Sequence, residues 1–169
     1  MELKDVLGVI ETSEEFSDWK KSHKNAYLVH AFVMMDEANK DIWQVGYFDA
    51  GNSLMSTFVV SPGRIDIIPD QEVFKSEHKI AELVPARVKL SVKEALGIAE
   101  EYRKENYPKE VPAKSFFIIQ VVEKHGQVFN ITYFTHSLKT INIKLSTENG
   151  RVVHHSCEAL VSFDKNFSA

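Results

Sequence analysis

Two stretches of this chain share one pattern, and that repetition limits what the chain can fold into. A Tyr-Phe pair begins at Tyr47 and a Gly-Arg pair follows at Gly63, and the same two pairs recur at Tyr133 and Gly150. The Tyr-Phe pairs lie 86 positions apart and the Gly-Arg pairs 87, so one inserted residue aligns the two copies. Because self-similarity at a fixed spacing indicates a structural unit used more than once, the sequence predicts an internal duplication.

Each copy alternates apolar and polar residues in the manner typical of β-strands. Apolar runs at 27–33 and 115–122 open the two copies, and Phe129, Ile131 and Tyr133 later alternate with polar neighbours. The turns between the runs are short, which favours antiparallel pairing because parallel neighbours need long crossovers. Each copy therefore reads as three antiparallel strands, with one face buried and the other in water.

A helix with its own start signal precedes each set of strands. Ser91 and Glu94 have the spacing of a capping box, and apolar residues then recur at helical spacing until Pro108 ends the segment. In the first copy Ser13 can cap a shorter helix that points Trp19 at the sheet. The sequence thus predicts a helix ahead of each sheet.

These elements predict an α+β fold of two repeated modules, each a helix packed on a curled antiparallel sheet. The first module covers 1–84, with a connecting helix at about 71–83, and the second covers 85–169. Pro85 marks the boundary, because a proline disfavours helix in the residue before it. Each half is near the size at which one core is marginal, so we expect the modules to pack on each other.

The composition excludes several classes of protein. The formal net charge is −4, from 20 basic and 24 acidic side chains spread along the chain, so no positive field favours nucleic acid. A single cysteine, Cys157, cannot form an internal disulfide. The first residues lack a signal-peptide pattern, and no window has the run of apolar residues that a membrane span needs. We therefore expect a cytoplasmic protein that does not bind a membrane.

Two motifs in the second copy resemble the PepSY domain, a small α+β module. The segment Leu90–Ala99 is similar to the family's opening helix motif, and Leu145–Val152 is similar to its closing turn motif. The resemblance covers about residues 88–162, and the first copy shares it only through its likeness to the second. It implies a protein-binding or regulatory role. A cystatin-like or nuclear-transport-factor-like curled sheet fits the same pattern.

One cluster near the end of the chain contains residues that could bind a metal or act as a nucleophile. Zinc takes imidazole and thiolate ligands together, but His154 and His155 face opposite sides of a regular strand. Only His155 and Cys157 share a side, and two ligands do not close a metal site. The same two residues could form a thiolate–imidazole pair oriented by Glu158 or Asp164. Residues two apart on a strand lie too far apart for this, so neighbours elsewhere in the fold would have to complete the pair.

Other signatures of catalysis are weak. Carboxylate pairs at 14–15, 36–37 and 100–101 fall in expected turns or on exposed helix faces, where solvation is the usual role of charge. The glycines are isolated, so they form no phosphate-binding loop, and Gly63 and Gly150 suit turns that need positive φ. The sequence therefore predicts no cofactor and no assembled catalytic set.

Two hypotheses about function remain. The first is a non-enzymatic protein that binds another protein or itself through its sheet edges or open face. The second is a small-ligand-binding protein or enzyme with a pocket in the concavity of a curled sheet. That pocket would be lined by Trp43, Tyr47 and Phe58 in the first copy, or by Phe129, Tyr133 and Ile143 in the second.

Overall fold

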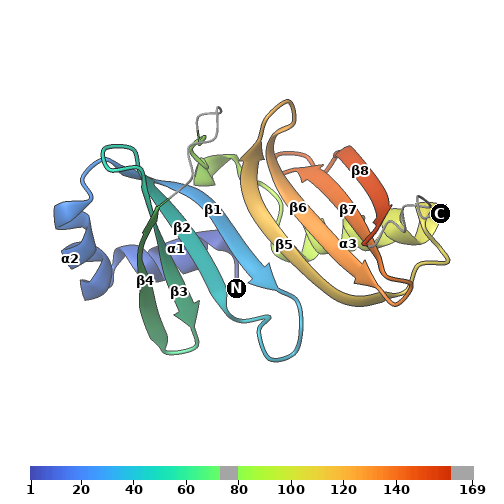
Figure 1. Ribbon diagram of the computed structural model, residues 1–169, viewed down its shortest axis with the longest axis horizontal. Helices are drawn as coiled ribbons and strands as arrows, with labels where there is room; N and C mark the ends of the chain where they lie inside the picture. Colours follow the sequence, from blue (N-terminus) through green and yellow to red (C-terminus); the bar gives the residue numbers. More distant parts are fainter. Residues whose placement is uncertain (73–79, 161–169) are drawn as a thin grey trace, which may run out of the picture.

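The computed structural model describes residues 1–72 and 80–160 and places all their strands in one antiparallel sheet (Figure 1). The eight strands lie in the order β4-β3-β2-β1-β5-β6-β7-β8. Their bounds are β1 Ala26–Met34, β2 Trp43–Asp49, β3 Leu54–Ser61, β4 Arg64–Glu72, β5 Pro112–Val122, β6 Gly126–Thr135, β7 Lys139–Ser146 and β8 Val152–Ala159. The first and second sets of four strands each form a meander.

The prediction of two repeated modules, each a helix on its own sheet, is wrong. Strands β1 and β5 pair with each other, from His30 opposite Gln120 to Met34 opposite Phe116, and this ladder makes the sheet continuous. Both strands are apolar on both faces, so an edge position would leave their backbone groups and side chains in water. The result is a single sheet-dominated domain, with a fourth strand after each Gly-Arg turn that the sequence did not predict.

The connecting helix predicted at about 71–83 is absent at both of its ends. Gln71 and Glu72 are the last residues of β4, and residues 80–83 form no helix. The ladder between β3 and β4 extends to the pair Leu54 and Glu72, so the chain stays extended there. The middle of the predicted helix lies outside the described residues.

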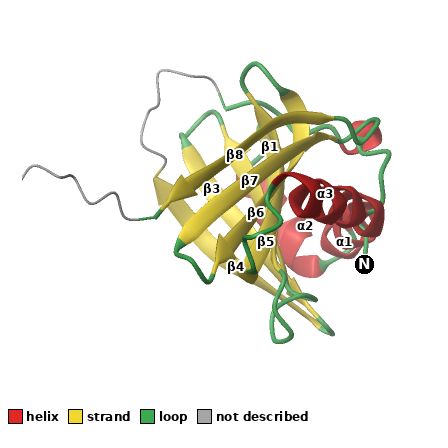
Figure 2. Ribbon diagram, turned by 90° about the vertical axis from the view of Figure 1, so that its right-hand side faces the viewer, coloured by secondary structure: helices red, strands yellow, loops and turns green. Residues whose placement is uncertain are grey.

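Three helices lie on one side of the sheet (Figure 2). They are α1 Leu3–Glu11, α2 Glu14–Ser22 and α3 Val92–Asn106, and a 3-10 turn covers Pro85–Arg87. The predicted caps are confirmed: Ser13 Oγ accepts from Phe16 N at 3.1 Å, and Ser91 and Glu94 form both bonds of a capping box. No helix within the described ranges is long and apolar enough to cross a membrane.

One hydrophobic core fills the space between the helices and the sheet. The ring of Phe117 in β5 lies 5.6 Å from Trp43 in β2 and 6.1 Å from Phe129 in β6, measured between centroids. Phe117 therefore connects the two halves of the core across the β1–β5 ladder. The largest fully buried side chains include Trp43, Phe58, Phe117, Phe129, Ile10, Leu83, Ile119, Ile131, Ile141, Ile143 and Leu145.

Candidate functional site

The aromatic residues predicted to line a pocket all lie on the face of the sheet that the helices cover. None is more than 6% exposed, and each packs in the hydrophobic core. The helices occupy the space on this face that a ligand would need. The role of these residues in ligand binding stays a prediction. The hydroxyl of Tyr47 is buried without a hydrogen-bond partner among the described residues. Burial raises the pKa of Tyr47 strongly, so this phenol is neutral. The set is Trp43, Tyr47, Phe58, Phe129, Tyr133 and Ile143.

His154 and His155 face opposite sides of β8, as the sequence predicts. The ring of His154 lies 5.3 Å from that of His125 in the β5–β6 turn. His155 instead faces α3, where its Nδ1 lies 2.6 Å from the hydroxyl of Tyr107 and its ring lies 5.0 Å from Tyr102. His155 thus helps to hold the end of α3 against the sheet.

Cys157 has the properties of a structural thiol. It lies opposite Ile141 on the helix side of β8, and the hydrogen bond of His155 goes to Tyr107. Burial, followed by the charge of Glu110, raises the pKa of Cys157, so the thiol is protonated at neutral pH and is a weak nucleophile. Asp164, a predicted orienting group, lies outside the described residues. Within residues 1–72 and 80–160, no three His, Cys, Asp or Glu side chains gather as metal ligands.

The predicted carboxylate pairs have structural partners or lie in water. Asp36 Oδ1 accepts from the backbone of Ala38 and Asn39 at 3.0 Å and so fixes the turn after β1. Glu100 forms an ion pair of 2.7 Å with Arg103, which is 7% exposed. The remaining members, Glu14, Glu15, Glu37 and Glu101, are exposed.

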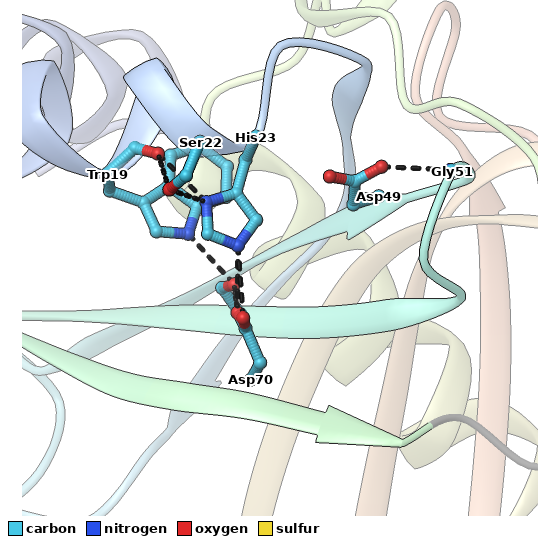
Figure 3. Close-up of polar contacts among 7 residues, drawn as sticks. Trp19, Ser22, His23, Asp49, Gly51 and Asp70 are labelled. Carbon is cyan, nitrogen blue, oxygen red and sulfur yellow. Dashed lines mark hydrogen bonds and ion pairs between the residues drawn. The ribbon is translucent and has the colours of Figure 1, made fainter.

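Four side chains under the first half of the sheet form a polar cluster that the sequence did not reveal (Figure 3). Trp19 in α2 donates from Nε1 to Ser56 Oγ in β3 at 2.9 Å, and Ser56 donates to Asp70 Oδ1 in β4 at 2.5 Å. His23, just after α2, approaches Asp70 Oδ2 with Nε2 at 3.0 Å. We call this group the α2 clamp. Its side-chain hydrogen bonds join residues 14, 37 and 47 positions apart, so no local motif could show it.

Both ring nitrogens of His23 face oxygen acceptors. Nδ1 lies 2.8 Å from the carbonyl oxygen of Trp19, and Nε2 faces the carboxylate of Asp70. A neutral imidazole has only one N–H group, so the ring donates to both oxygens only when it is protonated. In the neutral ring, the hydroxyl of Ser22, 3.0 Å from Nδ1, can donate to that nitrogen instead. The ring of His23 stacks on the indole of Trp19 at 4.6 Å between centroids, an arrangement that favours the protonated form.

The hydrogen bonds of the α2 clamp shift two pKa values in opposite directions. Burial by itself lowers the pKa of His23, but the bonds to Trp19 and Asp70 outweigh it, and the pKa is raised overall. The hydrogen bond from Ser56, with the bond and charge of His23, lowers the pKa of Asp70. The pair is therefore ionised across the mildly acidic range.

The α2 clamp has the residue types of a hydrolase triad but not its order. In a serine hydrolase the histidine lies between the serine and the carboxylate and removes the serine proton. Here Asp70 lies between Ser56 and His23, and both histidine nitrogens are already engaged. Nothing in this arrangement activates Ser56 as a nucleophile. The cluster fastens α2 to the outer strands β3 and β4.

We expect the α2 clamp to make the free energy of unfolding depend on pH. A raised histidine pKa stabilises the fold fully below the unfolded value of 6.5, and that stability is lost as pH rises through the folded pKa. The lowered pKa of Asp70 gives stability above 3.8, which is lost as pH falls through its folded pKa. His23→Gln should therefore cost about 1 kcal/mol or less near pH 5.5 and less above pH 8.

Urea unfolding at several pH values between 5 and 9 checks this expectation. The control is His136→Gln, because His136 is exposed in the β6–β7 turn. A difference between wild type and His23→Gln that stays constant over the whole range would contradict the assignment of His23 as the protonated partner.

The face of the sheet opposite the helices carries an aromatic strip and a polar ladder. No helix of the described residues covers this side, which we call the uncovered face (Figures 1 and 2). The aromatic strip consists of Phe32, Phe116 and Phe134, whose successive ring centroids are 5.4 and 5.9 Å apart. All three side chains are partly exposed. They cross β1, β5 and β6, so the strip lies over the junction of the two meanders.

The polar ladder lies beside the aromatic strip. Asn142 Nδ2 donates to Asn130 Oδ1 at 2.6 Å and to Thr132 Oγ1 at 3.0 Å, and Lys144 Nζ donates to Asn142 Oδ1. Burial lowers the pKa of Lys144. No carboxylate pairs with Lys144 among the described residues, so its charge is open to a partner from outside.

Comparison with known proteins finds a likeness of fold alone. No family model matches the chain, and no curated protein matches it. A solved structure of a candidate lipoprotein from Clostridium difficile 630 is similar, with a TM-score of 0.56 and 16% identity over 86% of this chain and 91% of that chain. The similarity is one of fold. At this identity it assigns neither an activity nor a binding partner.

Proposed function

We propose that this is a non-enzymatic binding protein whose uncovered face receives another protein. The aromatic strip carries the proposal. Exposed apolar patches on soluble proteins mark interaction sites more often than chance, and aromatic residues are enriched in protein interfaces. Phe32, Phe116 and Phe134 form such a patch on the side of the sheet that the helices leave open.

The neighbouring polar ladder supports a specific contact. Asn130, Asn142 and Lys144 fix one another by hydrogen bonds, so they would lose little conformational entropy when a partner binds. A preorganised polar group beside an aromatic patch matches the usual division of an interface into an apolar centre and a polar rim.

The groups that could have supplied catalysis have structural contacts instead. Burial keeps the Cys157 thiol protonated, His155 bonds to Tyr107, and the carboxylate of Asp70 separates Ser56 from His23. These contacts support a binding role rather than an acid–base or nucleophilic one. The PepSY resemblance stays a proposal that agrees with this role.

The two edges of the sheet differ in how well they resist an added strand. In β4, Pro69 has no N–H to donate, and the ion pair of Arg64 with Asp66 places charge on the edge. Strand β8 contains no proline. If the partner also adds a strand to the sheet, β8 is therefore the edge that would accept it.

Photo-crosslinking in the cell of origin tests the proposal. Benzoylphenylalanine in place of Phe116 should capture a discrete protein partner, because the label lies in the middle of the aromatic strip. The same label in place of Asp18, which is exposed on α2, should not capture that partner. Adding Phe32→Ser should weaken the adduct at position 116 by about tenfold, the loss expected when one anchoring side chain is truncated.

Two outcomes would overturn the proposed function. One is the absence of any protein adduct at position 116 while the labelled protein keeps its wild-type circular dichroism spectrum. The other is an identical set of adducts at positions 116 and 18, because such capture would reflect contact without a specific surface.

A further inference from the structure

Cationic side chains gather at one corner of the uncovered face, where the β5–β6 turn meets the start of β8. A hollow there is lined by Lys124, His125, Arg151, Val152 and Val153. His154 follows on β8 and contacts the ring of His125. The hollow lies apart from the aromatic strip, and of the residues in the proposed partner contact it has only Lys144 of the polar ladder as a neighbour.

The sheet register adds a further cation to this corner. Lys144 in β7 lies directly opposite His154 in β8, so their side chains are neighbours on the same face. His154 thus neighbours both Lys144 and His125. We call Lys124, His125, Lys144, Arg151 and His154 the basic corner.

Few acidic residues in the β5–β6 turn and in strands β7 and β8 offset the positive charge of the basic corner. Their acidic residues are Glu123 and Glu158, and Glu148 in the preceding turn pairs with Arg87 at 2.8 Å. Within residues 1–72 and 80–160, neither Lys144 nor Arg151 forms an ion pair with a carboxylate. In a chain of net charge −4, this concentration of unpaired cations departs from the overall balance.

The environment of His154 reflects this local positive field. Burial, followed by the charges of Lys144, His125 and His155, lowers the pKa of His154, while Glu158 opposes the shift. Like charges that crowd one another destabilise the protonated ring. A bound anion would relieve that repulsion and stabilise the same ring.

We propose that the basic corner binds a phosphate group. The hollow presents the guanidinium of Arg151, the ammonium of Lys124 and the imidazole of His125, and His154 and Lys144 add charge beside it. Arginine binds phosphate in a bidentate manner, and lysine adds charge. A dianionic group with several acceptor oxygens can engage more of these donors at once than a single carboxylate can. The phosphate could be free, on a small molecule, or in a lipid headgroup.

Nuclear magnetic resonance titration of the histidine side chains tests this site directly. Inorganic phosphate should raise the apparent pKa of His154 and displace the ring signals of His125, compared with chloride at the same ionic strength. The signals of His23 and His136 should not change. Arg151→Gln and Lys144→Gln should each weaken phosphate binding by about tenfold, the effect of losing one charge-assisted contact. Glutamine at 144 can still donate to Asn142, so this variant keeps the ladder.

Lys109→Gln is the matched control, because Lys109 is an exposed lysine before β5 and the charge change is the same. It should leave phosphate binding unchanged. Flotation with phosphatidylcholine vesicles, with and without phosphatidic acid, separates the two sources. Binding to phosphatidic acid that Arg151→Gln removes would assign a lipid headgroup, and a response to inorganic phosphate alone would assign a soluble ligand.

The proposal is overturned if phosphate and chloride give equal histidine shifts and phosphatidic acid gives no flotation. It is also overturned if Lys109→Gln weakens binding as much as Arg151→Gln does, since that result would indicate general charge attraction. Because no protein partner is present in these measurements, their failure would leave the crosslinking test of the aromatic strip unaffected.

Discussion

Replacing Phe117 with alanine is expected to lower the free energy of unfolding by about 3–5 kcal/mol. The Phe117 side chain is fully buried, and its ring packs between Trp43 of the first half and Phe129 of the second. Strands on both sides hold these neighbours in place, so the core cannot collapse into the space that the ring leaves. The loss should therefore contain a full cavity term.

The same variant tests whether the sheet unfolds as one unit. Both tryptophans, Trp19 and Trp43, belong to the first half, so their fluorescence reports on that half, while far-ultraviolet circular dichroism reports on the whole chain. With one cooperative unit, both signals should shift to the same lower denaturant midpoint in Phe117→Ala. Phe116→Ala is the matched control, since it lies next along β5 on the uncovered face and should cost much less.

A fluorescence midpoint that stays at the wild-type value in Phe117→Ala, while the circular dichroism midpoint falls, would contradict a single unit. That outcome would mean that the β1–β5 ladder does not couple the two halves energetically.

Gly46→Ala should destabilise the protein by about 1–3 kcal/mol, as overpacking of a well-filled position does. A Cβ added at Gly46 would lie 2.1 Å from Cε1 of His30 and 2.6 and 2.7 Å from its two ring nitrogens. The imidazole of His30 therefore occupies the space that a side chain at position 46 would need. Burial lowers the pKa of His30, so the ring lies there in its neutral form.

A double-mutant cycle separates this contact from a general effect of alanine in β2. In the His30→Ala background, Gly46→Ala should cost less than about 0.5 kcal/mol, which gives a coupling energy of about 0.5 kcal/mol or more. Urea unfolding of the four proteins measures it. Additive costs in the double variant would show that the imidazole is not what excludes a side chain at position 46.

Local features of the fold could be predicted from the sequence. Ser91 and Glu94 lie three residues apart and complete their capping box within one turn, so neighbouring residues contain all the information. Alternation along β7 likewise predicted that Ile141 and Ile143 face the core, and both are fully buried. Gly63 and Gly150 have the positive φ that their turns require.

The pairing of distant strands could not be predicted in the same way. His30 and Gln120 are partners across the β1–β5 ladder, yet neither residue carries a signal that selects the other. Apolar patterning shows that a strand needs neighbouring strands. It does not show which strands these are. The predicted connecting helix failed for a related reason, since the extended form of Gln71 and Glu72 depends on pairing with β3.

The candidate sites also differ in whether they depend on neighbouring residues or on the pairing of distant segments. Alternation placed His154 and His155 on opposite faces, because that depends on one strand alone. The approach of His125 and Lys144 to His154 depends on a turn and on the register of two strands, and the α2 clamp joins His23 to Asp70 across much of the first half. Such clusters become visible only in three dimensions.

The β1–β5 ladder also has a consequence for synthesis on the ribosome. Strand β1 ends at Met34, but β5 begins only at Pro112, so the nascent first half has an apolar strand with one unpaired edge for most of its translation. An unprotected edge of this kind is a template for aggregation, and pairing between distant strands is slow. We therefore expect stable folding to wait until the second half has left the exit tunnel, and we expect chains truncated after β4 to depend on chaperones to stay in solution.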